Sequence, residues 1–258
     1  MVYMMEDRDI RSRLLLGDDA MRLLGEARVI IFGIGGVGSW CAESLVRTGV
    51  RHLTVVDGDR VSPSNINRQL TATVSTVGLP KVDVLRQRLL DIRPDAEIDA
   101  RFERFGSLTV NDTVTAKHLS EQGLPNSETV AELETFDCII DAIDSLADKM
   151  LLIRTACETE TFFVSSMGAA LKTDPSRIQV APFDKVHGCP LAKALRRRFK
   201  HEGLWPSRPF PCVFSDEQGS NKFEIEPHAN GSLMHVTATF GLRLAALVIQ
   251  DIILQSSP

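Results

Sequence analysis

A glycine-rich turn is the first stretch whose residue types and spacing could bind a phosphate group. It reads GIGGVG over residues 33–38, and its glycines are Gly33, Gly35, Gly36 and Gly38. Glycine can adopt positive φ and lets a phosphate approach the backbone closely. A helix that begins at Ser39 would direct unpaired N–H groups and the positive end of its dipole at that phosphate. The turn predicts a nucleotide-binding site, and a merely tight strand-to-helix turn is the structural alternative.

An acidic residue follows the turn at a spacing that suits a ribose contact. Asp57 ends a second apolar run, and together with the glycines it satisfies the dinucleotide-binding fingerprint. Asp59 follows closely, and two carboxylates would repel a polyphosphate unless one bound the sugar and the other a cation. The pair therefore implies Mg²⁺, but the glycine spacing alone does not decide between NAD and ATP.

Two cations further along favour a triphosphate. Arg68 offers a planar fork for phosphate oxygens, and Lys81 offers a compact charge on a flexible stem. A triphosphate attacked at its α-phosphate needs such charges, because negative charge moves to the leaving pyrophosphate. The structural alternative is equally open: a solvated segment, with Lys81 beginning an amphipathic helix that ends at Ile92.

The remaining elements must bring these residues to one edge of a sheet. Short apolar runs at residues 29–32, 52–57, 98–102, 137–144 and 162–166 predict strands, and helical segments between them supply parallel crossovers. Asp144 would then lie at the same carboxyl edge as Asp57, where open α/β sheets bind ligands. We expect a Rossmann-like α/β fold: a mostly parallel sheet with helices on both faces. The 258 residues are expected to form one domain, in which residues 184–235 are an extension covering the active site.

Composition narrows the functional classes. The net charge of -5 argues against general binding of nucleic acid, although a local basic patch is compatible with it. The five cysteines form no CxxC pair, which favours reduced thiols and a cytoplasmic protein. The apolar stretch at residues 236–254 contains Arg243, Gln250 and Asp251. We therefore expect a buried or amphipathic helix there, without stable membrane insertion.

Five motifs in combination resemble the adenylating domain of ubiquitin-activating-like enzymes, a superfamily that includes the thiamine- and molybdopterin-pathway adenylyltransferases. They are GxGGxG at 33–38, DGD at 57–59, NxNRQ at 65–69, GxPK at 78–81 and DAIDS at 141–145. The resemblance implies that Mg²⁺ and ATP are used to form an acyl-adenylate on a carboxylate, usually by a homodimer. It makes Asp144 the magnesium-side or attack-positioning carboxylate, and it matches Arg11 to an arginine lent to the neighbouring subunit's ATP. It implies further nucleotide contacts from Asn65, Asn67 and Ser145.

The second half resembles one branch of that superfamily, the dehydratases of threonylcarbamoyladenosine in tRNA. The resemblance rests on residues 168–170, 174–180, 190–199 and 212–215. It implies adenylation of the threonylcarbamoyl carboxylate, ring closure by an internal nucleophile and net loss of water. The sulfur-carrier branches hold zinc with CxxC pairs, so no zinc is expected here. Two alternatives remain: an adenylyltransferase for a sulfur-carrier protein that ends in Gly-Gly, and an NAD-binding Rossmann protein.

Two further features have open interpretations. A helix is predicted at residues 190–199. Its end and the next residue form a basic cluster of Arg196, Arg197, Arg198 and Lys200. The three arginines fan around the helix at about 100° per residue, so they are either a solvated face or a contact with tRNA phosphates. Cys212 is an ordinary buried thiol, an acceptor of sulfur from a cysteine desulfurase on its way to a sulfur-acceptor protein, or a thioester nucleophile.

Overall fold

A sheet of seven strands forms the centre of the computed structural model, which describes residues 8–105, 127–223 and 230–254. The strand order within these residues is β3-β2-β1-β4-β5-β7-β6. Every neighbouring pair is parallel except β6 and β7, which are antiparallel. The strands are β1 Arg28–Phe32, β2 His52–Val56, β3 Glu97–Arg101, β4 Cys138–Asp141, β5 Phe162–Ser166, β6 Ile178–Pro182 and β7 Pro211–Ser215.

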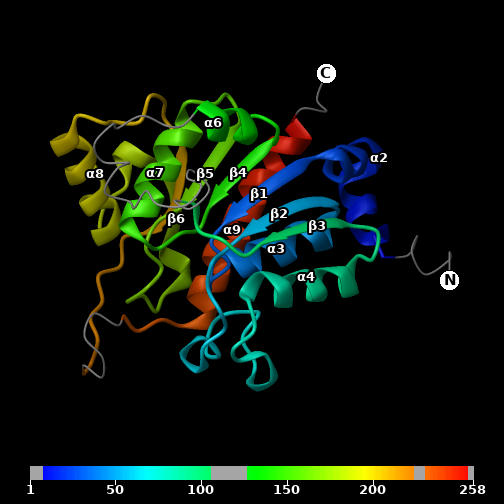
Figure 1. Cartoon of the computed structure of the whole chain (residues 1–258), viewed down its shortest axis with the longest axis horizontal. Coiled ribbons are helices and arrows are strands. Elements are labelled where there is room, and N and C mark those ends of the chain that lie inside the picture. Colours follow the sequence, from blue (N-terminus) through cyan, green and yellow to red (C-terminus); the bar gives the residue numbers. More distant parts are fainter. Residues whose placement is uncertain (1–7, 106–126, 224–229, 255–258) are drawn as a thin grey trace.

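Helices cover both faces of the sheet (Figure 1). One face carries α2 Ile10–Glu26, α3 Gly38–Thr48, α4 Lys81–Ile92 and α9 Met234–Leu254. The other carries α6 Ser127–Leu133, α7 Leu146–Cys157 and α8 Pro190–Glu202. Short 3₁₀ helices lie at Pro63–Asn65 (η1), Val74–Thr76 (η2), Pro175–Arg177 (η4) and Phe183–Lys185 (η5). The predicted Rossmann-like α/β fold is confirmed.

Alternating side chains of β1 explain why the sheet needs both layers. Val29 and Ile31 pack into the core beneath α3, α4 and α9, whereas Ile30 and Phe32 pack into the core beneath α6, α7 and α8. All four are at most 1% exposed, as expected for a central parallel strand. The continuous apolar run that predicted a buried strand reflects this two-sided burial.

Helix α9 is long and apolar because it is a core helix. By length and composition it could cross a membrane, but half of its most apolar window is buried inside the fold. Val236, Phe240, Leu244 and Val248 are fully buried, and the helix packs against α3, β5 and β7. Its apolar character is therefore accounted for by its place beneath the sheet.

Two features add to the predicted fold. Helix α2 begins at Ile10, and Gly17 interrupts it with a φ of 81°, which glycine adopts without strain. Strand β7 lies within the region 184–235, which was predicted as an extension covering the active site. Because β7 pairs with both β5 and β6, this region also contributes a strand to the central sheet. Residues 224–229 of that region are outside the described part of the chain.

Candidate nucleotide-binding site

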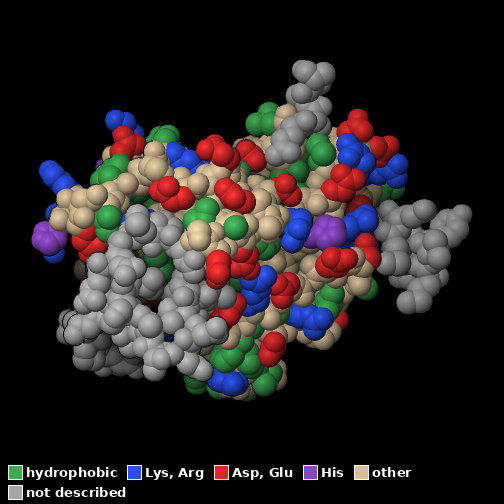
Figure 2. Space-filling view, turned by 45° about the horizontal axis from the view of Figure 1, so that its top comes forward, with side chains coloured by type: hydrophobic (Ala, Val, Ile, Leu, Met, Phe, Trp, Pro, Cys, Tyr) green, Lys and Arg blue, Asp and Glu red, His purple; other side chains and the backbone are tan. Residues whose placement is uncertain are grey.

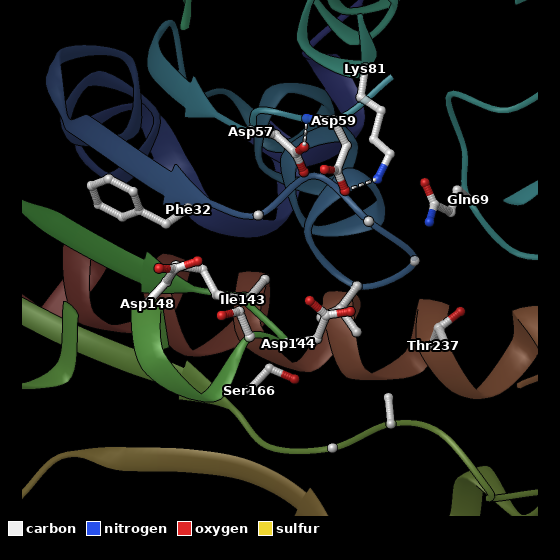
Figure 3. A pocket seen from close by; sticks show the side chains of 18 of the residues that line it. Phe32, Asp57, Asp59, Gln69, Lys81, Ile143, Asp144, Asp148, Ser166 and Thr237 are labelled. Atoms are coloured by element: carbon white, nitrogen blue, oxygen red, sulfur yellow. Dashed lines mark hydrogen bonds and ion pairs between the residues drawn. The ribbon is translucent and has the colours of Figure 1, made fainter. Parts of the chain in front are cut away.

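A cavity of about 530 Å³ lies at the carboxyl ends of β1, β2, β4 and β5. Figure 3 shows Asp57, Asp59 and Lys81 on one side of it and Ile143, Asp144 and Ser166 on the other, with the turn after β1 between them. These segments meet because the carboxyl ends of parallel strands share one edge of the sheet. This cavity, which we call the nucleotide cavity, brings together acids and cations that are up to 91 positions apart in the sequence.

The glycine turn is shaped by packing at two of its four positions. Gly33 has a φ of 91°, and a Cβ there would lie 2.6 Å from the carbonyl oxygen of Ala142. A Cβ on Gly38 would lie 1.8 Å from the carbonyl oxygen of Gly33. Gly33, Gly35 and Gly36 line the cavity, whereas Gly38 does not. The turn can therefore approach a ligand through Gly35 and Gly36, while Gly38 keeps the turn closed on itself.

Asp57 is held rigidly at the end of β2. Its Oδ2 accepts a hydrogen bond from the backbone N–H of Ile34 at 2.6 Å, and its Oδ1 accepts one from the N–H of Asp59 at 2.8 Å. Burial raises the pKa of Asp57, although the nearby Lys81 ammonium opposes that rise. The carboxylate oxygens retain lone pairs toward the cavity, so Asp57 can accept hydrogen bonds from ribose hydroxyls.

Asp59 connects two cations at the cavity wall. Lys81 Nζ donates to Asp59 Oδ2 at 3.0 Å, and Arg104 Nη2 donates to Asp59 Oδ1 at 2.9 Å. Lys81 is 5% exposed and Arg104 also lines the cavity. Arg104 lies beyond β3, outside every motif of the sequence, and only the fold brings it to Asp59. The site thus holds a second pre-aligned cation that the sequence did not indicate.

Arg68 lines the cavity and is held by its own segment. Its Nη1 donates to the Ser64 carbonyl and to Asn67 Oδ1, both at 2.9 Å. Asn67 Nδ2 donates to the Ser232 carbonyl at 2.9 Å. Asn65 Oδ1 accepts from the Ser62 N–H at 3.1 Å in a cap of η1. Neither asparagine lines the cavity, so the structure places both behind Arg68 as supports for its segment.

Gln69 and Thr237 line the cavity, although neither was predicted as a site residue. Gln69 is 8% exposed, and its buried Oε1 has no hydrogen-bond partner among the described residues. A buried amide oxygen without a partner is costly, and a ligand donor would satisfy it. The motif contained Gln69, so a signal existed. Thr237 comes from α9, far along the chain, and no local pattern could have indicated it.

Asp144 stands opposite the cations (Figure 3). It is exposed at the cavity, and within the described residues its carboxylate has no hydrogen-bond or ionic partner. Ser145, at the N-cap of α7, and Asp148 also line the cavity. No group of three His, Cys, Asp or Glu residues that could hold a metal ion occurs in the described ranges. A Mg²⁺ ion usually takes only one or two carboxylates and otherwise binds phosphates and water, which a single unpaired Asp144 fits.

Arg11 lies outside the nucleotide cavity of its own chain. It is exposed near the start of α2 and does not line the cavity. The exposed side chains Ile10, Leu14 and Leu15 surround it on the same helix and are 46%, 75% and 84% exposed. Its predicted contact with a nucleotide thus requires a second subunit.

The basic cluster on α8 divides by what each side chain contacts. Arg196 Nη1 donates to the carbonyls of Phe183 and Val186 at 3.1 and 2.7 Å, and Arg198 Nε pairs with Glu202 at 2.7 Å. Arg197 and Lys200 are exposed, and their side chains have no partner among the described residues. Figure 2 shows Lys and Arg side chains at the left end of the molecule, where α8 lies in Figure 1.

Cys212 is placed as an interior thiol. It is fully buried on β7, and burial raises its pKa well above the ordinary value. A buried, protonated thiol is a weak nucleophile. All five cysteines are free and buried. The structure therefore favours the ordinary structural interpretation of Cys212 over sulfur transfer.

Comparisons with known proteins agree with this geometry. Residues 7–253 match the ThiF family. The chain is 37% identical over 207 residues to the tRNA threonylcarbamoyladenosine dehydratase of Bacillus subtilis, covering 80% of this chain and 74% of that protein. It is similar, with a TM-score of 0.79 and 31% identity, to the structure of Escherichia coli tRNA N6-threonylcarbamoyladenosine dehydratase in complex with AMP. The ATP complex of the same protein gives a TM-score of 0.76, and both comparisons cover 97% of this chain and 95% of the other.

Proposed function

The chain belongs to the ThiF family, and on that basis we propose that it is an ATP-dependent dehydratase of threonylcarbamoyladenosine in tRNA, acting through an acyl-adenylate. The observation that carries the proposal is the nucleotide cavity, where Asp57, Lys81 and Asp144 converge at one edge of the sheet. The similarity to ATP-bound and AMP-bound structures along nearly the whole chain supports it. NAD binding is disfavoured, because the cavity presents three cations in the region beside Asp57.

The residues divide by the part of the nucleotide they would contact. Asp57 would hold the ribose, and the turn at Gly35 and Gly36 would approach the phosphates. Arg68 and Lys81 would neutralise charge that develops on the leaving pyrophosphate. Lys81 is paired with Asp59, and its ammonium has three N–H donors, so it can donate to a phosphate oxygen as well. Binding and charge stabilisation are thereby assigned to different side chains.

The chemistry proposed needs no enzyme nucleophile. A carboxylate oxygen of the threonylcarbamoyl group attacks the α-phosphorus, and pyrophosphate leaves. A nitrogen or oxygen within the same group then attacks the activated acyl carbon, and AMP leaves with the former carboxylate oxygen. Because both reacting groups belong to one molecule, closure gains up to about 7–11 kcal/mol from proximity when they are well oriented. The lack of a reactive thiol at Cys212 is consistent with this route.

Magnesium belongs to the proposal as an ion shared between the protein and the nucleotide. Asp144 would be its protein ligand or would orient the attacking carboxylate, and the phosphates would supply the remaining contacts. When bound, the ion would neutralise phosphate charge during attack. The chain's own contribution is an unpaired carboxylate placed across the cavity from Lys81 (Figure 3).

The proposed partners are tRNA and a second copy of the chain. Arg197 and Lys200 are two exposed cations of α8 without a partner among the described residues, and they would contact tRNA phosphates. The exposed apolar side chains around Arg11 are suited to a homodimer interface that would bring Arg11 to the partner's nucleotide. A cysteine desulfurase and a sulfur-acceptor protein are weaker proposals, because Cys212 is buried. A cytoplasmic location accords with the free thiols of all five cysteines.

Nucleoside mass spectrometry tests the proposed function. Modified tRNA is incubated with the protein, Mg²⁺ and ATP, and the threonylcarbamoyladenosine is expected to lose one water. With ¹⁸O in the threonylcarbamoyl carboxylate, the label should appear in AMP, because that oxygen leaves on the adenylate. An unlabelled AMP would contradict the acyl-adenylate. ATP–pyrophosphate exchange only with a carrier protein ending in Gly-Gly would support the sulfur-carrier alternative instead.

A further inference from the structure

A buried ion pair lies directly beneath the loop that carries Asp144. Lys149 Nζ and Asp141 Oδ2 are 2.8 Å apart, and both side chains are 0% exposed. Asp141 is the last residue of β4, and Lys149 lies in the first turns of α7. The loop between them, residues 142–145, forms one wall of the nucleotide cavity. The pair thus closes the base of the loop that presents the proposed catalytic carboxylate.

Each member of the pair also binds the loop backbone. Asp141 Oδ1 accepts a hydrogen bond from the Ile143 N–H at 3.0 Å, and Lys149 Nζ donates to the Ile143 carbonyl at 2.8 Å. Both polar groups of Ile143 are therefore fixed by a single buried charge pair. Ile143 directly precedes Asp144, so the rotation of its peptide groups determines where the Asp144 carboxylate points. Figure 3 shows that carboxylate turned toward the side of the cavity where Lys81 lies.

We propose that Lys149 and Asp141 are positioning residues, which clamp the loop at residues 142–145 so that Asp144 stays directed into the nucleotide cavity. The inference rests on the proposed function for the role of Asp144. Neither Lys149 nor Asp141 lines the cavity, so neither is expected to contact ATP or tRNA. Their effect reaches the nucleotide through the backbone of Ile143.

The first residue of the loop, Ala142, is fixed independently of the clamp, whereas the direction of Asp144 depends on it. The Ala142 N–H donates to the Phe32 carbonyl at 2.8 Å, and Gly33 packs so closely on Ala142 that it has no space for a Cβ. Asp144 itself has no partner among the described residues. Between the fixed Ala142 and helix α7, Ile143 is therefore the residue through which the clamp can control the direction of Asp144.

Ser165 provides a matched control within the same network. Its Oγ donates to Asp141 Oδ2 at 2.6 Å, and it is as fully buried as Lys149. Ser165 belongs to β5 and makes no hydrogen bond to residues 142–145. Ser165→Ala therefore perturbs the buried carboxylate without releasing the loop.

The test compares Ser165→Ala with the double variant Asp141→Asn/Lys149→Met. The double variant removes both charges together, because removing one alone would leave a buried unpaired charge and could unfold the protein. Four quantities are measured: Tm, amide hydrogen exchange of peptides covering residues 142–148, AMP affinity, and the rate of ATP–pyrophosphate exchange with threonylcarbamoyl tRNA.

We expect the double variant to lose hydrogen-exchange protection at residues 142–148 and to react about 100-fold more slowly, the scale expected for a displaced catalytic group. Its AMP affinity should fall far less than its rate, because the turn and Asp57 remain. Ser165→Ala should lower Tm and leave protection and rate as in the wild type. The clamp is refuted if protection and rate in the double variant equal those in Ser165→Ala, or if AMP affinity falls in parallel with rate. Failure of the proposed function is seen separately, as a wild-type protein inactive on modified tRNA; hydrogen exchange then decides the clamp alone.

Discussion

Lys81 and Asp59 form an ion pair at the wall of the nucleotide cavity, with Nζ and Oδ2 3.0 Å apart. Asp59 also accepts from Arg104, so one carboxylate is shared by two cations that a triphosphate could also contact. The Lys81 ammonium has three N–H donors, so it can donate to a phosphate oxygen beside Asp59. Its largest contribution is expected when phosphate charge increases, in the transition state.

Lys81→Ala and Asp57→Asn should consequently have different kinetic effects. Loss of Lys81 should lower kcat by about 100- to 1,000-fold, the range seen when one preorganised donor to a developing charge is removed. Asp57→Asn should mainly raise the KM for ATP, because a ribose contact is present equally in the ground and transition states. Steady-state kinetics with varied ATP measures both. Equal changes of kcat and KM in the two variants would contradict this division of roles.

Asp144→Ala should abolish adenylation while the protein stays folded. The carboxylate is exposed at the cavity and has no partner among the described residues, so its loss removes no packing and no internal hydrogen bond. Pyrophosphate exchange measures adenylation, and thermal unfolding checks the fold, with Tm expected at the wild-type value. Near-normal turnover of the variant with Mg²⁺ and ATP would show that the catalytic carboxylate lies elsewhere.

The sequence predicted those site residues that belong to a local motif, and it missed those that only tertiary packing brings to the cavity. The turn at residues 33–38, Asp57 and Asp144 each follow a strand end, and parallel pairing brings strand ends to one edge. Lys81 instead begins α4 and was indicated by its charge within the GxPK motif. Arg104 and Thr237 come from segments joined to the cavity only by tertiary packing, so no spacing in the sequence reveals them. The same limit applies to β7, because its insertion between β5 and β6 depends on a long-range pairing.

The basic cluster on α8 shows that closeness in sequence does not reveal which partners the side chains contact. Four cations close together in sequence predicted either a solvated face or a contact with tRNA phosphates, yet the structure uses Arg196 to hold the carbonyls of Phe183 and Val186. Residue type and spacing give the direction of each side chain around a helix, but not which internal acceptors the fold places within reach. Asn65 and Asn67 illustrate the same point, because they support the segment of Arg68 and do not line the cavity.

Arg11 gives a test of assembly. If it reaches the partner subunit's nucleotide, Arg11→Ala and Lys81→Ala should each be inactive alone, and a mixture should regain activity. A mixed dimer contains one cavity with an intact Lys81 that receives Arg11 from the other chain. Statistical mixing would give about half of the dimers one working site, as follows from a symmetric two-fold assembly. Activity is measured after subunit exchange is verified by mass spectrometry; no recovery despite exchange would assign Arg11 to its own chain or to no role.

Glu217 should contribute to stability in a defined pH range. The N–H of Asp174, the Thr173 hydroxyl and the Thr173 N–H all donate to its carboxylate and lower its pKa to about 2 from an ordinary 4.5. Because the folded-state pKa is lower than the unfolded one, the stabilisation is present above pH 4.5 and is lost as pH falls toward 2. Glu217→Gln should lower Tm at neutral pH and weaken the decline of Tm across that acid range.

The control for Glu217 is Glu134→Gln. Glu134 is exposed and its side chain has no partner among the described residues, so its removal should leave the pH profile of Tm unchanged. Thermal unfolding is followed at several pH values for the three proteins. A Glu217→Gln profile parallel to the wild-type profile would show that the carboxylate's hydrogen bonds contribute nothing to the acid response.

The surface of α8 allows a sharper test of tRNA binding than the sequence alone did. Arg197 and Lys200 are exposed and unpaired within the described residues, whereas Arg198 is paired with Glu202. Arg197→Ala/Lys200→Ala should weaken tRNA binding and leave ATP affinity unchanged. Each lost phosphate contact should flatten the plot of log affinity against log salt by about 0.7–0.9. Arg198→Ala is the matched control, with a smaller change expected because its guanidinium already has a carboxylate partner. Binding is measured across a salt series; parallel slopes and equal affinities for the double variant and the wild type would identify these cations as a solvated face.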